Sequence, residues 1–181
     1  MNRPDRGRAI EAARLLNEFV GDLVVGTRTL DLLEAPNIKS IVTDAFRTTM
    51  TRMCVSHLVV TLSKWQELYD RYKALIPSDV REACRDLRKE LERRDVRGFR
   101  NKAAGHIWDS DTKRPISGSE VDSRLATIYD GNFEHFLLWI NDPDSNQFPH
   151  NVVAIVEHVR NRLRAEFNIT DADLFSDPIR P

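Results

Sequence analysis

Cysteine and long apolar runs are scarce in this sequence of 181 residues. Its two cysteines, Cys54 and Cys84, each lie within an apolar helical pattern, so we expect two reduced core thiols rather than a disulfide or a metal pair. No apolar run approaches the roughly 18 residues that a membrane span needs, and Glu11 and Arg14 stand where a signal peptide would be apolar. These absences predict a cytoplasmic protein without a membrane segment.

The chain also lacks the motifs of several enzyme classes. It has no His-Glu-x-x-His and no paired Cys-x-x-Cys, and His150 and His158 have no carboxylate at ligand spacing. It contains neither a Gly-rich phosphate loop nor a Gly-x-Ser-x-Gly nucleophile elbow. We therefore predict no metal site and no cofactor.

The composition is that of a soluble globular protein, with 41% hydrophobic and 30% charged residues. No Gly/Ser-rich stretch divides the chain, and its length suits one domain with a sizeable core. We therefore expect residues 1–181 to form a single domain.

Apolar residues recur every three or four positions along most of the chain, which is typical of amphipathic helices. A break of phase after Leu91 indicates a new or kinked helix that Asp95 can cap, and Ser117 begins a capping box for a later helix. Residues 26–37 are predicted to be a connection, and the tail from about 168 to be loosely held. The predicted helices cover about 4–25, 40–76, 78–91, 95–105, 117–140 and 152–163. An all-α helical bundle follows.

The net charge of −1 conceals a basic segment. Residues 81–102 hold nine Arg or Lys against five Asp or Glu, whereas residues 103–181 hold seven against thirteen. Clustered cations raise the local concentration of a polyanion, so the segment suits phosphate binding. The alternative is a solvated helix face with internal Glu-Arg pairs, and charge alone favours that interpretation.

Within this segment, Arg100-Asn101-Lys102-Ala103-Ala104-Gly105-His106 places an arginine six residues before a histidine. A second arginine, Arg52, lies five residues before His57, and with 21 arginines and five histidines about one or two such pairs arise by chance. Context separates the two pairs. Arg52 lies in the most apolar part of the 40–76 helix, where we expect His57 to be a buried core residue. The other pair lies at a predicted helix end beside a polar loop over 110–119.

The stretch from Arg100 to His106 resembles the signature of HEPN domains (higher eukaryotes and prokaryotes nucleotide-binding), many of which are RNases. Asn101 is the polar residue that the family usually places after the arginine, and small residues precede His106, with Asp109 shortly after it. In the abortive-infection branch of this superfamily the motif closes with Ala-His, and here Gly105 replaces that alanine. The resemblance covers residues 95–109, and beyond them only the helical layout matches.

The resemblance implies a four-helix HEPN-like core with extra helices, and a metal-independent endoribonuclease of the toxin-antitoxin or phage-defence type with Arg100 and His106 as its catalytic pair. Such an enzyme uses the 2′-hydroxyl of RNA as an internal nucleophile and leaves a 2′,3′-cyclic phosphate. Histidine titrates near neutral pH and can move the proton, while arginine is a permanent forked cation that can hold phosphate oxygens. Asn101 can orient one of these groups, and Lys102 and Arg97 can hold backbone phosphates.

Helical geometry separates the two catalytic candidates, because residues six apart on one helix point about 120° from each other. Arg100 and His106 therefore share a site only if the chain leaves helical geometry near Gly105 or if a second subunit completes the site. HEPN RNases are generally dimers with a shared cleft, so the resemblance implies a homodimer, and it suggests a small nucleotidyltransferase-like antitoxin as a further partner. The alternative function is a non-catalytic HEPN-like bundle that binds a nucleotide or a protein partner.

Overall fold

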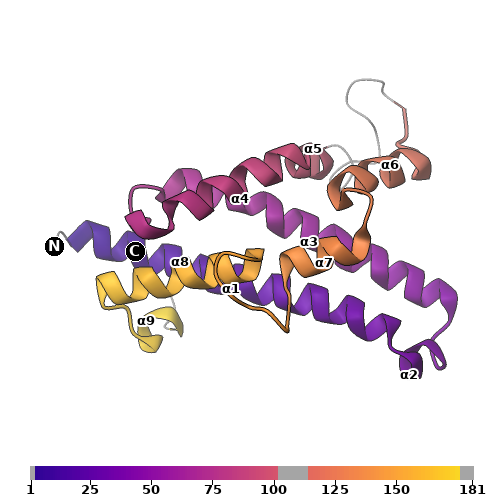
Figure 1. Cartoon of the computed structure of the whole chain (residues 1–181), viewed down its shortest axis with the longest axis horizontal. Coiled ribbons are helices and arrows are strands. Elements are labelled where there is room, and N and C mark those ends of the chain that lie inside the picture. Colours follow the sequence, from indigo (N-terminus) through magenta and orange to yellow (C-terminus); the bar gives the residue numbers. More distant parts are fainter. Residues whose placement is uncertain (1–2, 102–113, 176–181) are drawn as a thin grey trace.

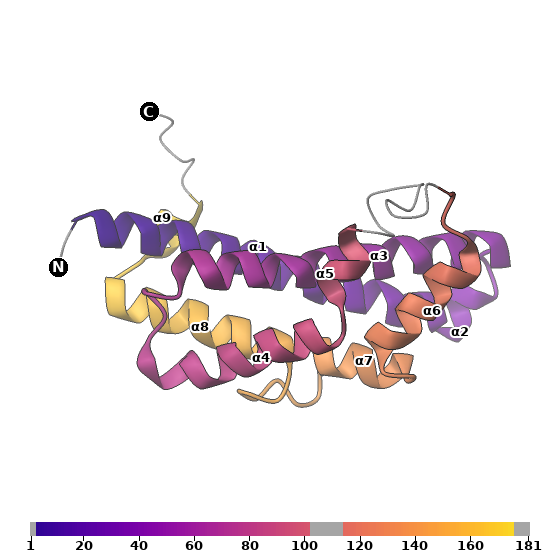
Figure 2. The ribbon, with the colours of Figure 1, turned by 90° about the horizontal axis from the view of Figure 1, so that it is seen from above.

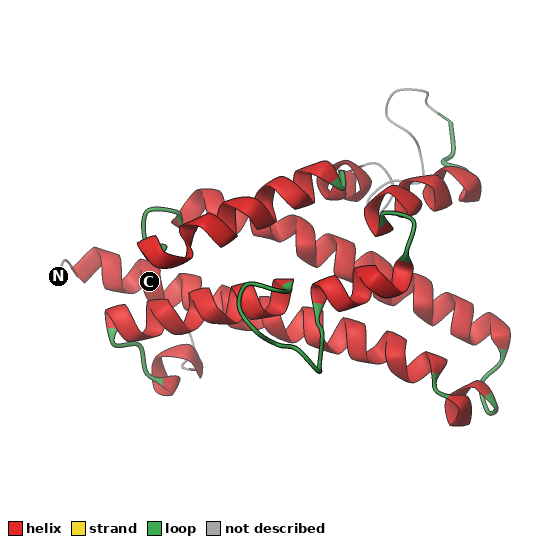
Figure 3. Ribbon diagram, in the orientation of Figure 1, coloured by secondary structure: helices red, strands yellow, loops and turns green. Residues whose placement is uncertain are grey.

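Helices make up the fold, as the sequence predicts. The computed structural model describes residues 3–101 and 114–175, and over these ranges it is an all-α bundle (Figure 3). Its frame is a pair of long antiparallel helices, α1 (Arg3–Glu34) and α3 (Asp44–Tyr72), joined by the short α2 (Pro36–Lys39) (Figure 1). The all-α prediction is confirmed.

α1 is longer than predicted, because Gly26 lies inside the helix rather than at its end. The prediction of a connection over residues 26–37 was wrong for residues 26–34, which belong to α1. Gly26 is buried where α1 crosses α3, and a Cβ atom on it would lie only 2.6 Å from Cδ2 of Leu58. The glycine thus permits a close approach of two helix backbones, a role that its sequence context does not distinguish from a helix stop.

Two further helices, α4 (Arg81–Arg93) and α8 (Val152–Phe167), complete a four-helix bundle (Figure 2). A 3₁₀ turn, η1 (Ser78–Val80), reverses the chain after α3, so that α4 packs along α3, and α8 closes the ring by packing against both α4 and α1. The four helices alternate in direction around this ring (Figure 1). Trp65 is fully buried in the core. The largest fully buried side chains are Trp65, Tyr72, Phe136, Leu16, Leu23 and Leu58.

The segment predicted as one helix over 117–140 is two helices, α6 (Gly118–Tyr129) and α7 (Phe133–Ile140). The capping box at Ser117 is confirmed at the start of α6. Asp130 and Gly131 adopt left-handed backbone conformations with φ of 56° and 75°, which end α6. The Asn132 side chain then accepts a hydrogen bond from the backbone N–H of His135 at 2.9 Å and starts α7.

The first part of the C-terminal tail is held against α1, which corrects the prediction of a loose tail for residues 168–175. Here α9 (Asp171–Phe175) buries Leu174, and the carboxylate of Asp173 lies 2.9 Å from the guanidinium of Arg6 in α1. The Nε atom of Arg14 donates a hydrogen bond to the carbonyl oxygen of Asp173 at 2.7 Å. Residues 176–181 lie outside the described residues.

Both cysteines are free thiols in apolar helix positions, as predicted. Cys84 is buried in α4, and burial raises the pKa of its thiol to about 12. Cys54 is partly buried in α3, and burial raises the pKa of its thiol as well. Cys84 therefore stays protonated and unreactive at neutral pH.

The close crossing at Gly26 predicts opposite effects for one substitution at two positions of α1. Gly26→Ala should lower the free energy of unfolding by about 1–2 kcal/mol, because the added methyl group meets the fully buried Leu58. Gly21→Ala should raise it by about 0.5–1 kcal/mol, because Gly21 is exposed, has no atom within 4 Å of its Cβ position and gains helix propensity. Urea unfolding midpoints measure both changes. Equal stabilisation by the two variants would contradict the close packing of α1 against α3 at Gly26.

Candidate functional site

A sharp change of direction after α4 creates the candidate site. Asp95 adopts a left-handed conformation with φ of 51°, and the chain then enters the four-residue α5 (Val96–Phe99), which packs on α3. The predicted break of phase after Leu91 is therefore confirmed. Asp95 occupies the N-cap position, but its side chain makes no capping hydrogen bond there. Its carboxylate instead lies against Gly98, where a Cβ atom would come within 2.1 Å of Oδ1.

A buried arginine, Arg94, fixes this change of direction. Only 8% of Arg94 is exposed, and its Nε atom donates to Oε1 of Glu90 at 2.7 Å. Its Nη1 atom donates to the carbonyl oxygen of Ile128 in α6, and its guanidinium lies 4.4 Å from the ring centroid of Trp139 in α7. One side chain thereby ties the end of α4 to both α6 and α7.

Arg100, the first catalytic candidate, follows α5 in helical conformation and reaches the C-terminal part of α3. Its Nη1 atom donates to Oε1 of Glu67 at 2.7 Å, and 38% of its side chain is exposed. A guanidinium has five N–H donors, so this contact orients the group and leaves further donors facing solvent. The structure thus places a partly exposed cation, paired with Glu67, at this position.

The structure describes two of the other predicted site residues, Arg97 and Asn101. Both are exposed. Arg97 lies one helical turn before Arg100, and no carboxylate within residues 3–101 and 114–175 pairs with it. Lys102 and His106 lie outside the described residues, so the geometry between His106 and Arg100 stays a prediction.

Four cations of the basic segment are neutralised by carboxylates near them. Arg88 bridges Asp70 in α3 and Glu92 in α4, and Lys89 pairs with Asp86. The remaining pairs on α4 are Arg93 with Glu90 and Asp130, and Arg94 with Glu90. The interpretation of α4 as a solvated face with internal Glu-Arg pairs is therefore confirmed for these residues. After α4, Arg97 has no described carboxylate partner, and Arg100 pairs with Glu67 of α3.

The second Arg-to-His pair, Arg52 and His57, lies on the exposed face of α3. The prediction that His57 is a buried core residue was wrong, since half of its side chain, 50%, is exposed. Its Nε2 atom is 3.6 Å from Oδ1 of Asp22 in α1. His57 thus lies at the exposed edge of the contact between α3 and α1.

A cavity of about 220 Å³ lies directly beside the candidate site. Gln66 and Leu91 are its buried walls, and charged residues of α3, α4 and the α4–α5 turn line its rim. The rim residues are Asp70, Arg88, Glu92, Asp95 and Arg97. We call it the Gln66 cavity. Sequence reasoning did not find it, because Gln66 and Arg97 come from segments that only the fold brings together.

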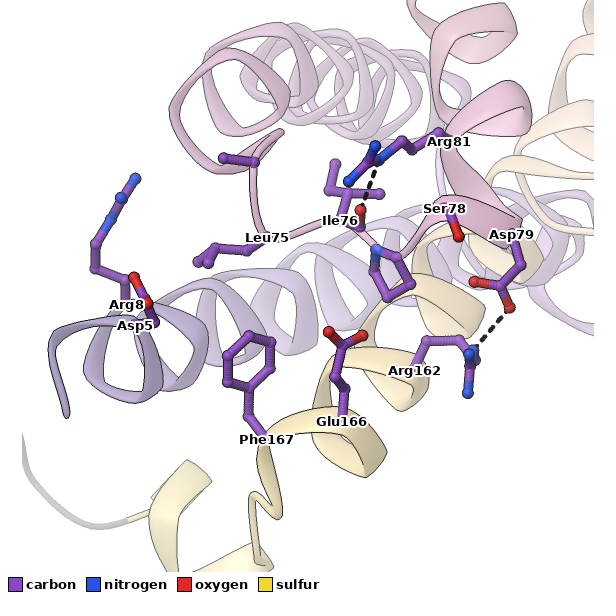
Figure 4. Close-up of a pocket in the computed structure, with 12 residues that line it drawn as sticks. Asp5, Arg8, Leu75, Ile76, Ser78, Asp79, Arg81, Arg162, Glu166 and Phe167 are labelled. Atoms are coloured by element: carbon purple, nitrogen blue, oxygen red, sulfur yellow. Dashed lines mark hydrogen bonds and ion pairs between the residues drawn. The ribbon is translucent and has the colours of Figure 1, made fainter. Parts of the chain in front are cut away.

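A larger cavity, of about 580 Å³, lies at the other end of α4 (Figure 4). Arg81 donates from Nε to the carbonyl oxygen of Ile76 at 2.9 Å, and Arg162 donates from Nε to Oδ2 of Asp79 at 2.8 Å. Its charged lining residues are Asp5, Arg8, Asp79, Arg81, Arg162 and Glu166. Three cations face three carboxylates, so this cavity offers no net charge to a polyanion.

No family model and no curated protein sequence matches this chain. A solved structure, that of integron cassette protein Vpc_cass2 from the mobile metagenome of V. paracholerae, is similar to it, with 24% sequence identity and a TM-score of 0.65. The match covers 87% of this chain and 96% of that chain. At this identity the likeness concerns the fold alone.

The described residues offer neither a metal centre nor a membrane segment. Between residues 3 and 101 and between 114 and 175, no three His, Cys, Asp or Glu side chains group as metal ligands. Within the same ranges, no helix combines the length and the apolar character that crossing a bilayer requires. One of the histidines considered as a ligand, His158, instead stacks on Phe148 with ring centroids 4.2 Å apart.

The burial of Arg94 predicts a large loss of stability when it is removed. Arg94→Ala should lower the free energy of unfolding by about 2–4 kcal/mol, because it leaves the Ile128 carbonyl and Glu90 without a buried partner. Arg85→Ala, on the exposed face of the same helix, should change it by less than about 0.5 kcal/mol. Thermal or urea unfolding measures both, and equal effects would contradict the anchoring role.

The ion pair between Glu90 and Arg94 also predicts how the loss of stability in Arg94→Ala depends on pH. The guanidiniums of Arg93 and Arg94 lower the pKa of Glu90 below its ordinary value of 4.5. The stabilisation from Glu90 is therefore complete above the pKa of the unfolded chain and is lost as pH falls through the lower folded value. The difference in the free energy of unfolding between wild type and Arg94→Ala should therefore become smaller below about pH 4.

Proposed function

We propose that this chain is a metal-independent endoribonuclease in which Arg100 holds the reacting phosphate and His106 moves the proton. The observation that carries the proposal is the contact between Arg100 and Glu67. It joins the arginine of the HEPN-like stretch to a helix 33 residues earlier in the chain and fixes its direction. A fixed cation costs little reorganisation when negative charge develops on a phosphate, which is the condition for effective electrostatic stabilisation.

The charges around Arg100 support a phosphate at this position. Glu67 takes one N–H donor of the guanidinium, and the fork of remaining donors suits two phosphate oxygens. Arg97, one helical turn earlier and without a described carboxylate partner, adds a second cation for a neighbouring phosphate. Asn101 and Lys102 follow directly in the sequence and supply further donors.

The reaction needs one proton carrier besides this cation. A base removes the proton of the 2′-hydroxyl, O2′ attacks the adjacent phosphorus, and the bond to the 5′ oxygen breaks as that oxygen takes a proton. The products are a 2′,3′-cyclic phosphate and a 5′-hydroxyl. His106 is the nearest histidine in the sequence to Arg100, and its ordinary pKa near neutrality suits both proton transfers.

A second function, a partner-binding module without catalysis, is favoured by another observation. Large apolar side chains are exposed around the α2 end of the α1–α3 hairpin, and clustered exposed apolar residues are typical of protein interaction sites. These residues are Val25, Leu32, Ile41, Phe46 and Met53. Such a surface also suits the small antitoxin that the HEPN resemblance suggests as a partner.

The ribonuclease proposal predicts cleavage of single-stranded or looped RNA that persists in excess chelator and leaves a 2′,3′-cyclic phosphate. His106→Ala should lower the rate by about 10²-fold to 10⁴-fold, the usual contribution of a positioned general acid or base. Arg100→Ala should lower it by about 10²-fold or more through loss of charge stabilisation. Gel assays and end-group analysis of the products measure these changes.

The second Arg-to-His pair provides matched controls for these variants. Arg52→Ala and His57→Ala should leave both the cleavage rate and the stability unchanged, because both side chains are exposed on α3. Cleavage that survives His106→Ala in a folded protein would contradict the proposal. Wild-type protein that never cleaves RNA but binds a protein partner tightly would support the module.

The proposed site also predicts a homodimer, because Arg100 and His106 do not share a face of a regular helix. Sedimentation at micromolar concentration should give a mass of about twice 20.9 kDa. In a mixture of Arg100→Ala and His106→Ala chains, partial recovery of cleavage would indicate a site completed across subunits. A strict monomer at all concentrations would rule out a shared site.

A further inference from the structure

The Gln66 cavity contains a polar side chain that has no protein partner among the described residues. Gln66 is only 7% exposed, and within residues 3–101 and 114–175 its side-chain amide makes no hydrogen bond. Polar side chains in the interior of a protein are usually satisfied by a neighbour, by water or by a ligand. Gln66 lines the cavity, so water or a ligand there can supply hydrogen bonds to its amide.

The size and lining of the cavity favour a single planar group. Its volume of about 220 Å³ is smaller than the roughly 300–1,000 Å³ of sites that hold whole drug-sized ligands. Leu91 gives it an apolar wall, and the exposed guanidinium of Arg97 lies at its rim, where it can stack on a flat ring. The space suits a base more than a complete nucleotide.

The charges at the rim select against a phosphate in the cavity and in favour of a base with an amino group. Three carboxylates, on Asp70, Glu92 and Asp95, face two cations, Arg88 and Arg97. Arg88 is already shared between Asp70 and Glu92. The carboxylate of Asp95 has no ion pair among the described residues and can accept a hydrogen bond from an amino group.

We propose that the Gln66 cavity binds an unstacked adenine base of single-stranded RNA, whose amino group and ring nitrogen pair with the Gln66 amide. An amide that donates one hydrogen bond and accepts another matches the donor and acceptor edge of adenine. The cavity adjoins the phosphate position in two ways. Gln66 directly precedes Glu67, and Arg97 lies one turn before Arg100. This proposal rests on the proposed function, since it assigns the base next to the phosphate that Arg100 holds.

RNA-binding sites usually use different residues to position the strand and to recognise a base, and the proposed site does the same. Phosphate contacts from Arg97 and Arg100 position the strand without reading its sequence, whereas the amide of Gln66 reads one base. Loss of Gln66 should therefore change which sequence is cleaved more than how fast RNA as a whole is cleaved.

The test compares wild type with Gln66→Leu, which keeps the size of the side chain and removes the amide. Cleavage ends mapped on a random-sequence RNA pool should show adenine at one fixed position beside the cut, and Gln66→Leu should lose about tenfold of that preference. Arg85→Ala, outside the cavity on α4, serves as the matched control and should retain the preference. Unfolding midpoints confirm that each variant is folded.

A binding measurement makes the test independent of catalysis. Short homopolymers of 2′-O-methyl RNA cannot be cleaved, and the adenosine polymer should bind wild type about tenfold more tightly than the uridine polymer, with the difference lost in Gln66→Leu. Cleavage or binding without an adenine preference, or with one that Gln66→Leu retains, would overturn the adenine site and leave the ribonuclease standing. Wild type that neither cleaves nor binds RNA would overturn both.

Discussion

The buried guanidinium of Arg94 is the interaction on which the arrangement of the candidate site depends. It joins the end of α4 to α6 and α7 through Glu90, the Ile128 carbonyl and the face of Trp139. A buried arginine costs desolvation energy that only a full set of partners offsets, so the position is closely specified. With α4 held there, the left-handed turn at Asp95 directs α5 across α3, and Arg100 meets Glu67.

Local sequence rules predicted the parts of this fold that local physics determines. The all-α class, the capping box at Ser117 and the break of phase before Asp95 follow from periodicity and cap chemistry, and each is confirmed. The errors have tertiary causes. The sequence around Gly26 predicts a helix end, but the glycine lies inside α1 and allows the close approach of Leu58. His57 lies in an apolar stretch, but half of its side chain is exposed beside Asp22 of α1.

The candidate site was predictable in part. The basic run identified Arg97 and Arg100, both of which the structure places at the α5 end of the bundle. Neither Glu67 nor Gln66 could be found from sequence, because each meets the site across more than 30 residues of chain and carries no motif of its own. The one available signal was the polar stripe of α3, where Gln66, Glu67 and Asp70 all face the basic segment.

Ion pairs are distributed unevenly between α4 and the segment that follows it. Arg88, Lys89 and Arg93 of α4 each pair with carboxylates. Beyond α4, Arg97 is exposed and has no described carboxylate partner, and Arg100 pairs with Glu67 while 38% of its side chain is exposed. In this account Glu67 works through Arg100: it orients the guanidinium and leaves the remaining N–H donors to the phosphate.

A double-mutant cycle on Arg100 and Glu67, read as the single-turnover cleavage rate of single-stranded RNA, tests this account most directly. The account predicts that Glu67→Ala slows cleavage in the wild-type background but causes no further loss in Arg100→Ala, a coupling of about 1 kcal/mol or more. Losses that simply multiply in the double variant, or an Arg100→Ala protein that cleaves as fast as wild type, would contradict it.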